Sequence, residues 1–388
     1  MEFAKKKIVV LGSTGSIGKN ALKIVAAHPE QFQVVGLSAH RQASLLAEQA
    51  TACQPQWAVL TDDGLDADSV RSQFDSLSNG VLRPAAELET LVQDPSVDVV
   101  LSAIVGVAGL HSNWAALGAG KTLALANKET LVAGGGLVMD RARQFGARIL
   151  PVDSEHNAIF QAAQAGRRSE IERVILTASG GPFRNHSIEQ LKSVTLQETL
   201  NHPTWNMGRK ITVDSATMMN KALEIIEARW LFDLPADQIR VMIHPESVIH
   251  SLVEFTDGSV LAQLSPPDMK LPIQHALTYP DRLQSPAAKM DWDQVHQLNL
   301  APPDLERFPA LQLGFEVADQ GGTCGAVLNA ANESAVQAFL ENKIGFLDIV
   351  RACRDVLDNH NFVQDPEFDQ IIEADRWARE EIDKWMST

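Results

Sequence analysis

Paired cysteines and long apolar runs are what this 388-residue chain lacks, and each absence excludes a class of protein. Its three cysteines, Cys53, Cys324 and Cys353, lie far apart with no Cys-x-x-Cys pair, so neither a disulfide framework nor a zinc knuckle is predicted. No apolar run is long enough to span a bilayer, so we expect no membrane partner. Residues 1–7 lead straight into a strand without an export or import signal, and we therefore expect a cytoplasmic location.

Basic residues are also in the minority. Lys and Arg number 33 against 49 Asp and Glu, which gives a formal net charge of −16 at pH 7. Nucleic acids and anionic membranes are bound through clustered Lys and Arg, so neither is an expected partner. An anionic ligand must instead find a local positive pocket, which screening over about 8 Å leaves largely independent of the net charge.

Short β-branched runs alternate with helical stretches through residues 8–150. This alternation predicts a doubly wound parallel sheet, an α/β domain of the Rossmann-like kind, over residues 1–150. The strands are expected at residues 8–11, 34–37, 57–60, 97–101 and 122–125.

The pattern changes after residue 150. Strands near 174–176, 241–243 and 259–264, with a loop rich in glycine and proline at about 180–208, predict an α+β domain over 151–280. Residues 281–308 carry several prolines and no sustained periodicity, which predicts a linker. Apolar residues at helical spacing then predict a C-terminal helical bundle over 309–388. Its helices are expected at 309–320, 326–341, 346–359 and 370–386.

A glycine pattern follows the first expected strand. Gly12, Gly15 and Gly18 have the spacing G-x-x-G-x-x-G and lead into a helical stretch over 19–27. Glycines let the backbone approach a pyrophosphate, and the helix N-terminus offers free N–H groups to its oxygens. We therefore predict a dinucleotide site here; a purely structural glycine turn is the alternative.

The end of the second expected strand indicates which dinucleotide binds. NAD sites usually hold an Asp or Glu there for the ribose hydroxyls, whereas this chain has Ser38-Ala39-His40-Arg41. An arginine without an acid favours NADP. A solvated cation at the start of a helix is the alternative for Arg41.

The run Pro151-Val152-Asp153-Ser154-Glu155-His156-Asn157 indicates a divalent metal site. If it is extended, Asp153 and Glu155 point to the same side because side chains alternate along a strand. Mg²⁺ and Mn²⁺ prefer such oxygen ligands and leave positions for water and substrate. The alternative is a helix N-terminus near Asn157, capped by Asp153 or Ser154.

Two further segments carry candidate site residues. Lys128 follows the fifth expected strand, at the sheet edge where open α/β folds bind ligands, and is predicted to hold a substrate oxygen. Residues 213–224 predict one capped helix with Ser215 near its N-terminus and with Asn220, Lys221 and Glu224 on a common face. Glu224 is a candidate third metal carboxylate, and Ser215, Asn220 and Lys221 suit a phosphate. The alternatives are an exposed lysine and a surface ion pair.

The loop at about 180–208 is a candidate lid. Gly180-Gly181-Pro182 stands at one end and Gly208 at the other, and the loop carries His202, Trp205 and Met207 outside any apolar stripe. This pattern favours a cover over the substrate, whereas packing in the core is the alternative.

Taken in order, these motifs resemble the 1-deoxy-D-xylulose 5-phosphate reductoisomerase family, whose members use NADPH and a divalent metal in the non-mevalonate isoprenoid pathway. The resemblance covers nearly the whole chain. It rests on the segments 12–18, 126–130, 151–156, 179–183, 202–208, 215–221 and 244–250.

The resemblance implies a role for individual residues. The implied NADPH contacts are Thr14, Gly15, Ser16, Ile17, Arg41, Asn127, Glu129 and Gly208, together with His40 and Gln42, where relatives often carry Gly and Asn. The implied ligands for Mg²⁺, Mn²⁺ or Co²⁺ are Asp153, Glu155 and Glu224, which with Lys128 form the catalytic set. The implied substrate contacts are Lys128, Ser154, Glu155, Ser179, His202, Ser215, Asn220, Lys221 and Glu224, with Trp205 and Met207 on the closing loop.

The implied reaction converts a phosphorylated ketose, 1-deoxy-D-xylulose 5-phosphate, to 2-C-methyl-D-erythritol 4-phosphate by retro-aldol cleavage, re-aldol joining and reduction by NADPH. A homodimer is also implied. Two other functions stay open at this point: another NADP-dependent sugar or aldehyde dehydrogenase, and a catalytically silent NADP-binding regulator.

Overall fold

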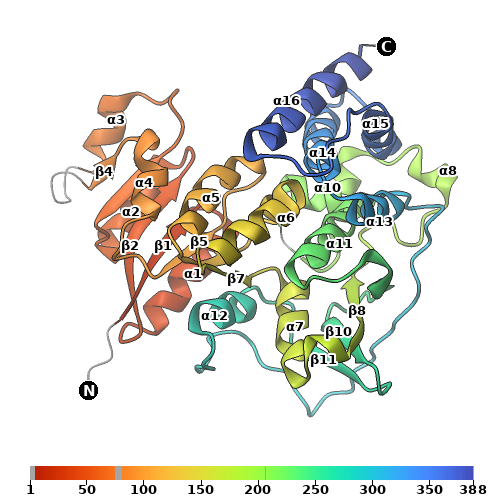
Figure 1. Cartoon of the computed structure of the whole chain (residues 1–388), viewed down its shortest axis with the longest axis horizontal. Helices are drawn as coiled ribbons and strands as arrows, with labels where there is room; N and C mark the ends of the chain where they lie inside the picture. The colour runs from red at the N-terminus through yellow and green to blue at the C-terminus, as the bar shows by residue number, and fades with distance from the viewer. Residues whose placement is uncertain (1–4, 75–80, 206, 388) are drawn as a thin grey trace. The chain divides into compact units, whose positions relative to one another are not determined.

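The computed structural model describes residues 5–74, 81–205 and 207–387 and divides the chain into two compact units (Figure 1). Unit 1 comprises Met1–Asn127, Asp140–Asp153 and Asp268–Ala288. Unit 2 comprises Lys128–Met139, Ser154–Pro267 and Lys289–Thr388. Both units are therefore discontinuous in sequence, and the functional division of the sequence at residues 150, 280 and 308 stays a prediction.

Unit 1 is built on a seven-stranded parallel sheet, which confirms the predicted fold class. The strand order is β4-β3-β2-β1-β5-β6-β7, so the order reverses beside β1. The strands are β1 (Lys6–Leu11), β2 (Phe32–Ala39), β3 (Trp57–Leu60), β4 (Leu82–Arg83), β5 (Val99–Ser102), β6 (Thr122–Leu125) and β7 (Arg148–Pro151). Central strands such as β1 are apolar and buried because helices cover both faces of such a sheet.

The helices of unit 1 follow the strands as a doubly wound fold requires. They are α1 (Ser16–Ala27), α2 (Ala43–Cys53), α3 (Ala67–Ser72), α4 (Leu88–Val92), α5 (Leu110–Gly118) and α12 (Lys270–Thr278). α12 comes from much later in the chain and packs against α1, β6 and β7. α6 (Glu129–Gln144) begins in unit 2 and ends in unit 1, with a non-helical residue at Gly135.

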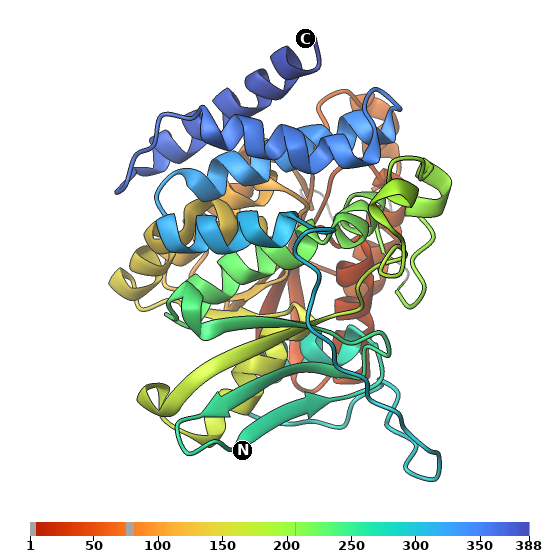
Figure 2. The ribbon, with the colours of Figure 1, turned by 90° about the vertical axis from the view of Figure 1, so that its right-hand side faces the viewer.

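Unit 2 contains a four-stranded mixed sheet (Figure 2). Its strands are β8 (Ile171–Ala178), β9 (Ile239–Ile243), β10 (Ile249–Phe255) and β11 (Val260–Leu264), in the order β11-β10-β8-β9. β10 was not among the predicted strands, although it pairs antiparallel with both β8 and β11. Helix α7 (Ser154–Ala162) packs on β8, β10 and β11.

The remaining helices of unit 2 form its helical layers. They are α8 (Ile188–Leu191), α9 (Leu196–Thr199), α10 (Arg209–Thr217), α11 (Met219–Leu231), α13 (Ala310–Gln320), α14 (Cys324–Leu340), α15 (Phe346–Asp358) and α16 (Phe368–Trp385). The last four confirm the predicted C-terminal helices. Gly314 of α13 lets that helix approach α11, since a Cβ there would lie 2.7 Å from the Cα of Ala222. Gly325 of α14 does the same against α6, since its Cβ would lie 1.9 Å from the carbonyl oxygen of Val132.

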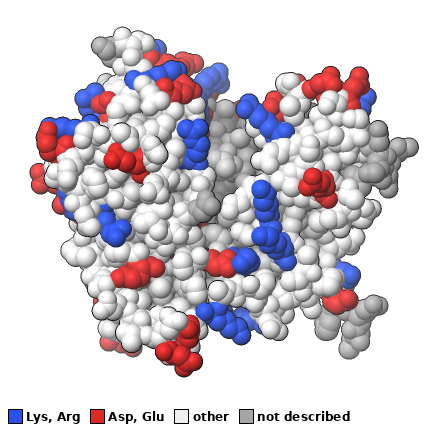
Figure 3. Space-filling view, turned by 180° about the vertical axis from the view of Figure 1, so that it is seen from behind, with Lys and Arg blue, Asp and Glu red and all other residues white. Residues whose placement is uncertain are grey.

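The segment between α12 and α13 has no helix or extended strand, and an isolated bridge joins Ala301 to Ile243. Among the described residues, no helix has both the length and the apolar character needed to cross a membrane. On the face shown in Figure 3, Lys and Arg side chains stand in small groups interspersed with acidic or uncharged residues. On this face, individual lysines and arginines therefore provide the positive charge for an anionic ligand.

Candidate active site

The predicted carboxylates gather where β7 gives way to α7. β7 ends at Pro151 and α7 begins at Ser154, so Glu155 lies in the first helical turn. The prediction that Asp153 and Glu155 point to the same side of a strand is wrong, and the helix start that we gave as the alternative is present, three residues earlier than Asn157. A helix N-terminus favours acidic residues electrostatically. A metal site and a helix N-terminus are thus compatible here, because the carboxylates lie at the start of the helix.

A compact group of possible metal ligands lies at this position. One ligand atom each from Asp153, His156 and Glu224 lies within 4.8 Å of the others. Glu155 joins the group through a cation, since its Oε1 lies 3.7 Å from Nζ of Lys221, which also pairs with Glu224. The other oxygen of Glu155 accepts a hydrogen bond of 2.9 Å from Oγ of Ser154.

His156 was missed by the sequence analysis. Its ring is fully buried and stacks on Phe232, with ring centroids 6.3 Å apart. Nε2 lies 2.9 Å from the backbone oxygen of Glu224, and Nδ1 lies 3.5 Å from Oε2 of Glu227. Both ring nitrogens thus face groups of α11, so His156 positions the backbone of Glu224. Its place directly after Glu155 in the acidic run was the available signal.

Glu224 is surrounded by hydrogen-bond donors. Nζ of Lys128 lies 3.2 Å from its Oε1 and 2.8 Å from Oδ1 of Asn220. Asn220 and Lys221 also donate to Glu224, so the predicted common face is present. The side chain of Glu224 is only 1% exposed, which excludes the surface ion pair that we gave as the alternative. Two ammonium groups and an amide thus lie at one buried carboxylate.

The helix predicted over 213–224 is in fact two helices. α10 ends at Thr217, Met218 takes a left-handed conformation with φ of 64°, and α11 begins at Met219. The prediction that Ser215 lies near a helix N-terminus is therefore wrong, because it lies near the end of α10. Asn220 and Lys221 instead occupy the first turn of α11, at the positive end of the helix dipole.

The candidate lid contains two short helices, α8 and α9, in place of an irregular loop. Gly180 and Gly181 take positive φ angles of 81° and 66°, and a Cβ on Gly181 would lie 2.6 Å from the carbonyl oxygen of Ser215. Only glycine permits this close approach to α10. Asn206 lies outside the described residues. Gly208 precedes α10, and its carbonyl oxygen accepts a hydrogen bond from Thr212.

His202 connects the two ends of the candidate lid. Nδ1 accepts hydrogen bonds from the backbone N–H groups of Thr204 and Trp205, at 3.1 and 2.9 Å. Nε2 must therefore carry the proton and donate to Oγ of Ser179, 3.1 Å away. Burial, and then the nearby Arg184, lowers the pKa of His202, which agrees with a neutral ring. The Trp205 ring lies beside that of His250, with centroids 6.4 Å apart.

The glycine pattern in unit 1 lies at the turn between β1 and α1, as predicted. Gly12 has φ of 74°, and a Cβ there would lie 2.5 Å from the carbonyl oxygen of Ala103. Gly15 precedes α1, and no side chain caps the helix. The first-turn N–H groups, near Thr14, Ser16 and Ile17, are thus not covered by a capping side chain.

His40, Arg41 and Gln42 follow β2, and the structure adds an acid that the sequence analysis missed. Nε of Arg41 lies 2.8 Å from Oδ2 of Asp62, which stands just beyond β3. β2 and β3 are parallel neighbours, so their carboxyl ends share one edge of the sheet. Nδ1 of His40 lies 3.2 Å from Oγ1 of Thr61 in the same pair of loops.

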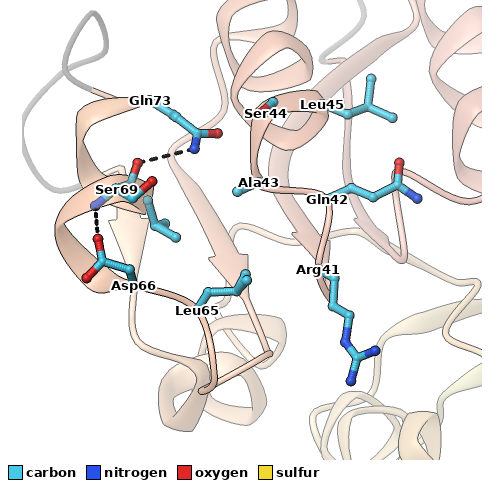
Figure 4. Close-up of a pocket in the computed structure, with 10 residues that line it drawn as sticks. Arg41, Gln42, Ala43, Ser44, Leu45, Leu65, Asp66, Ser69 and Gln73 are labelled. Atoms are coloured by element: carbon cyan, nitrogen blue, oxygen red, sulfur yellow. Dashed lines mark hydrogen bonds between the residues drawn. The ribbon is translucent and has the colours of Figure 1, made fainter.

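A cavity of about 430 Å³ lies between the start of α2 and α3 (Figure 4). Arg41 and Gln42 line it together with residues 43–45 of α2 and with Leu65, Asp66, Ser69, Val70 and Gln73. In Figure 4 the Arg41 side chain extends away from Asp66, Ser69 and Gln73, in and beside α3. The cavity therefore adjoins the position predicted to distinguish NADP from NAD.

Asn127 and Glu129 flank Lys128 but lie in different units. In unit 1, Nδ2 of Asn127 donates to the carbonyl oxygens of Ile104 and Gly106, at 2.8 and 2.9 Å, and so holds the loop after β5. In unit 2, Glu129 begins α6, and its Oε1 lies 3.4 Å from Nζ of Lys210. Lys210 was missed by the sequence analysis.

Comparison with known proteins places this geometry in a family. Residues 8–135 match a family model described as 1-deoxy-D-xylulose 5-phosphate reductoisomerase, and residues 149–232 and 264–381 match two models of the C-terminal domains of that enzyme. The 1-deoxy-D-xylulose 5-phosphate reductoisomerase of Pelodictyon phaeoclathratiforme is 48% identical over 382 residues, which are 98% of this chain and 100% of the relative.

Two solved structures are similar over almost their whole length. The reductoisomerase from Zymomonas mobilis in complex with NADPH has a TM-score of 0.92 and 42% identity, covering 99% of this chain and 100% of that one. A reductoisomerase in complex with NADPH, fosmidomycin and magnesium has a TM-score of 0.93 and 40% identity, covering 98% of each chain. The chain therefore belongs to the 1-deoxy-D-xylulose 5-phosphate reductoisomerase family.

Proposed function

We propose that this chain performs the reaction of its family, the NADPH- and divalent-metal-dependent rearrangement and reduction of 1-deoxy-D-xylulose 5-phosphate to 2-C-methyl-D-erythritol 4-phosphate in isoprenoid precursor biosynthesis. The observation that carries the proposal is the buried group in which Lys128, Asn220 and Lys221 surround Glu224. The similar structures that contain NADPH and magnesium support the same two cofactors here.

The metal ligands are Asp153, Glu155 and Glu224. Carboxylate oxygens suit Mg²⁺, Mn²⁺ and Co²⁺, and three of them leave coordination positions for two substrate oxygens. His156 is the competing candidate because it lies within the compact group. Its nitrogens face the Glu224 backbone and Glu227, which favours Glu155 as the third ligand. The bound metal would polarise the substrate carbonyl as a Lewis acid.

The substrate contacts are the donors around this metal position. The first turn of α11 offers the side chains of Asn220 and Lys221 to the substrate, and Ser179, Ser215 and His202 add neutral donors for a phosphate. Lys128, which reaches both Asn220 and Glu224, orients the substrate oxygens beside the metal ligands, with Ser154 next to Glu155. Trp205 and Met207 on the lid cover the site and exclude water.

NADPH supplies the hydride that reduces the rearranged aldehyde to the alcohol. In unit 1, the N–H groups at the start of α1, with Thr14, Gly15, Ser16 and Ile17, bind the pyrophosphate. The 2′-phosphate contacts are His40, Arg41 and Gln42. Asn127 in unit 1, and Glu129 and Gly208 in unit 2, complete the proposed cofactor contacts.

The assembly and location belong to the same proposal. A homodimer is supported by the exposed strand β11 at one edge of the unit 2 sheet, where Val260 and Leu261 are 49% and 41% exposed. A cytoplasmic location is supported by Cys53, Cys324 and Cys353, which are all free thiols. The functional domains are residues 1–150 for NADPH, 151–280 for metal and catalysis, the linker 281–308 and the helical domain 309–388.

The first experiment follows NADPH absorbance with purified protein and 1-deoxy-D-xylulose 5-phosphate, with Mg²⁺ or Mn²⁺ and then with excess chelator. We expect metal-dependent oxidation and 2-C-methyl-D-erythritol 4-phosphate as the product. Glu155→Gln should abolish turnover while NADPH affinity is retained, because only a metal ligand is changed.

Two outcomes contradict the proposal. Oxidation of NADPH with sugar aldehydes but not with the ketose phosphate would indicate a dehydrogenase. A folded protein that binds NADPH without any turnover would indicate a regulator. A Glu155→Gln variant whose sole defect is weaker NADPH binding would overturn the assignment of that residue to the metal.

A further inference from the structure

A second group of charged residues lies in unit 2, apart from the metal carboxylates. At its centre is Lys210, the second residue of α10, whose side chain is 20% exposed. Its Nζ lies 2.8 Å from Oδ2 of Asp214 and 3.4 Å from Oε1 of Glu129. The other oxygen of Asp214 accepts a hydrogen bond of 2.9 Å from Nδ2 of Asn332 on α14. We call these four residues the Lys210 network.

The network joins three helices that carry or support site residues. Glu129 is the first residue of α6 and follows Lys128. Asp214 directly precedes Ser215 on α10 and lies four residues after Lys210. Lys210 in turn follows Gly208, at the end of the lid, by two positions. Asn332 is fully buried in α14 and cannot shift without disturbing the core. One ammonium group thus connects the start of α10 with the start of α6.

The charges explain why a lysine occupies this position. Burial disfavours its charged form, but the carboxylates of Asp214, Glu129 and Glu333 outweigh this effect and raise the pKa of Lys210 above its ordinary 10.5. The side chains of Asp214 and Glu129 are 1% and 8% exposed. Without the lysine, two buried carboxylates would lack their shared counter-charge, which is costly in a low-dielectric interior.

We propose that Lys210 is a positioning residue for the cofactor: it holds the Glu129 carboxylate in place against the rigid pair of Asp214 and Asn332. The inference rests on the proposed assignment of Glu129 as an NADPH contact. Lys210 itself acts through Glu129, so its loss should weaken the use of NADPH more than the use of the ketose phosphate.

The test compares Lys210→Met in two backgrounds, the wild type and Glu129→Gln. In the wild type, Lys210→Met should raise the KM for NADPH about tenfold or more, as expected for losing a hydrogen bond to a charged group, with a smaller change in the KM for the ketose phosphate. In the Glu129→Gln background the same substitution should change the KM for NADPH about twofold or less, because the residue through which it acts is gone. Lys210→Arg, which keeps the charge, should restore part of the NADPH affinity.

Arg173→Met is the matched control. Arg173 pairs with Glu254 across β8 and β10, 3.2 Å away, and its side chain is 35% exposed against 20% for Lys210. This variant should leave both KM values unchanged even if thermal stability falls. If Lys210→Met does not fold, the comparison in the two backgrounds is made with Lys210→Arg, whose smaller effect must also vanish in Glu129→Gln.

Three results would overturn the inference. They are an unchanged KM for NADPH in folded Lys210→Met, an equal rise in both backgrounds, or the same rise in Arg173→Met. A wild type that does not turn over the ketose phosphate is a separate result, and it contradicts the proposed function. Direct NADPH binding to the same variants would then still decide the role of Lys210.

Discussion

Arg41 and Asp62 form an ion pair at the edge of the parallel sheet, 2.8 Å apart. The Arg41 side chain is 72% exposed, and exposed pairs of this kind contribute about 1 kcal/mol or less to stability. Arg41 can therefore leave Asp62 at small cost when a phosphate offers a stronger partner. The exposed pair is thus compatible with Arg41 as a contact for the 2′-phosphate of NADPH.

Arg41→Met should raise the KM for NADPH about tenfold or more, because a charge-assisted contact to the 2′-phosphate is lost. The KM for NADH, which has no such phosphate, should change about twofold or less. Steady-state kinetics with both cofactors measures the two effects. Asp62→Asn is the control, and it should leave the KM for NADPH equal or lower because Asp62 competes for Arg41. Equal rises with both cofactors would show that Arg41 does not recognise the 2′-phosphate.

At the residue scale, the sequence contained the site residues but only part of their arrangement. Asn220, Lys221 and Glu224 were placed on one face because helical spacing determines it. Asp62, His156 and Lys210 could not be found in the same way. Each meets a predicted site residue across 20 or more residues, at 21 for Asp62 with Arg41 and 81 for Lys210 with Glu129, and no local pattern encodes such contacts. The pairing of Lys210 with Asp214 does have helical spacing, but Asp214 was not a predicted site residue.

Strand β11 is a candidate element for an interface between two copies of the chain. It lies at one edge of the unit 2 sheet, so one side of its backbone has no neighbouring strand among the described residues. The 289–300 segment of the same unit is exposed, including Trp292 at 74% and Val295 at 94%, and projects outward in Figure 2. Exposed apolar surface of this extent is typical of an interface.

Leu261→Lys should therefore weaken the proposed homodimer, because a charge would be buried against the second copy. Light scattering should give about twice the 42.3 kDa chain mass for the wild type and a lower average mass for the variant at the same concentration. Leu347→Lys, at an exposed leucine of α15, is the matched control and should stay dimeric. A monomeric wild type would contradict the proposed assembly.

At the element scale, prediction succeeded where the local pattern is strong. The β-branched runs of unit 1 and the helical spacing after residue 309 gave elements close to the observed ones. It failed where tertiary packing decides. Met218 takes a left-handed conformation inside a stretch with helical spacing, and it is 3% exposed, so its surroundings in the core hold it there. The start of α7 at Ser154 was placed too late for a different reason, because the acidic run suits both a strand and a helix start.

Two buried histidines make the stability of the whole molecule sensitive to mild acid. Burial lowers the pKa of His250 in unit 2 to about 4, and burial together with Arg282 lowers that of His275 in unit 1 to about 4. The unfolded chain, with ordinary values near 6.5, therefore binds protons first as the pH falls. The free energy of unfolding should be at its full value above pH 6.5 and decrease between pH 6.5 and about 4.

The decrease should reach about 1.4 kcal/mol per pH unit for each histidine. His275→Gln should reduce the slope, because one of the two groups no longer titrates. Urea unfolding at several pH values, from about 7.5 to about 4.5, measures this slope of the free energy of unfolding against pH. His296→Gln, at an exposed position of the 289–300 segment, is the control. An identical slope in wild type and His275→Gln would contradict the assigned role of His275.

At the scale of the whole molecule, the sequence predicted the layers but not which parts of the chain fold together. α12 belongs to the later part of the sequence, yet it completes unit 1 by packing on α1, β6 and β7. Conversely, Lys128–Met139 belongs with unit 2 although it follows a strand of unit 1. Periodicity reports how each segment folds locally, whereas the partner of each apolar face is decided by the whole chain.

The charges around Glu224 determine how a divalent metal and an anionic substrate affect each other's binding. Lys128 and Lys221 together with Asp153, Glu155 and Glu224 leave one net negative charge at the site. The lysines thus offset most of the carboxylate charge, but without a metal the remaining negative charge repels a phosphorylated ketose. A divalent cation reverses the sign of the local charge to positive. Metal and anionic substrate should accordingly strengthen each other's binding by the same factor, as thermodynamic reciprocity demands.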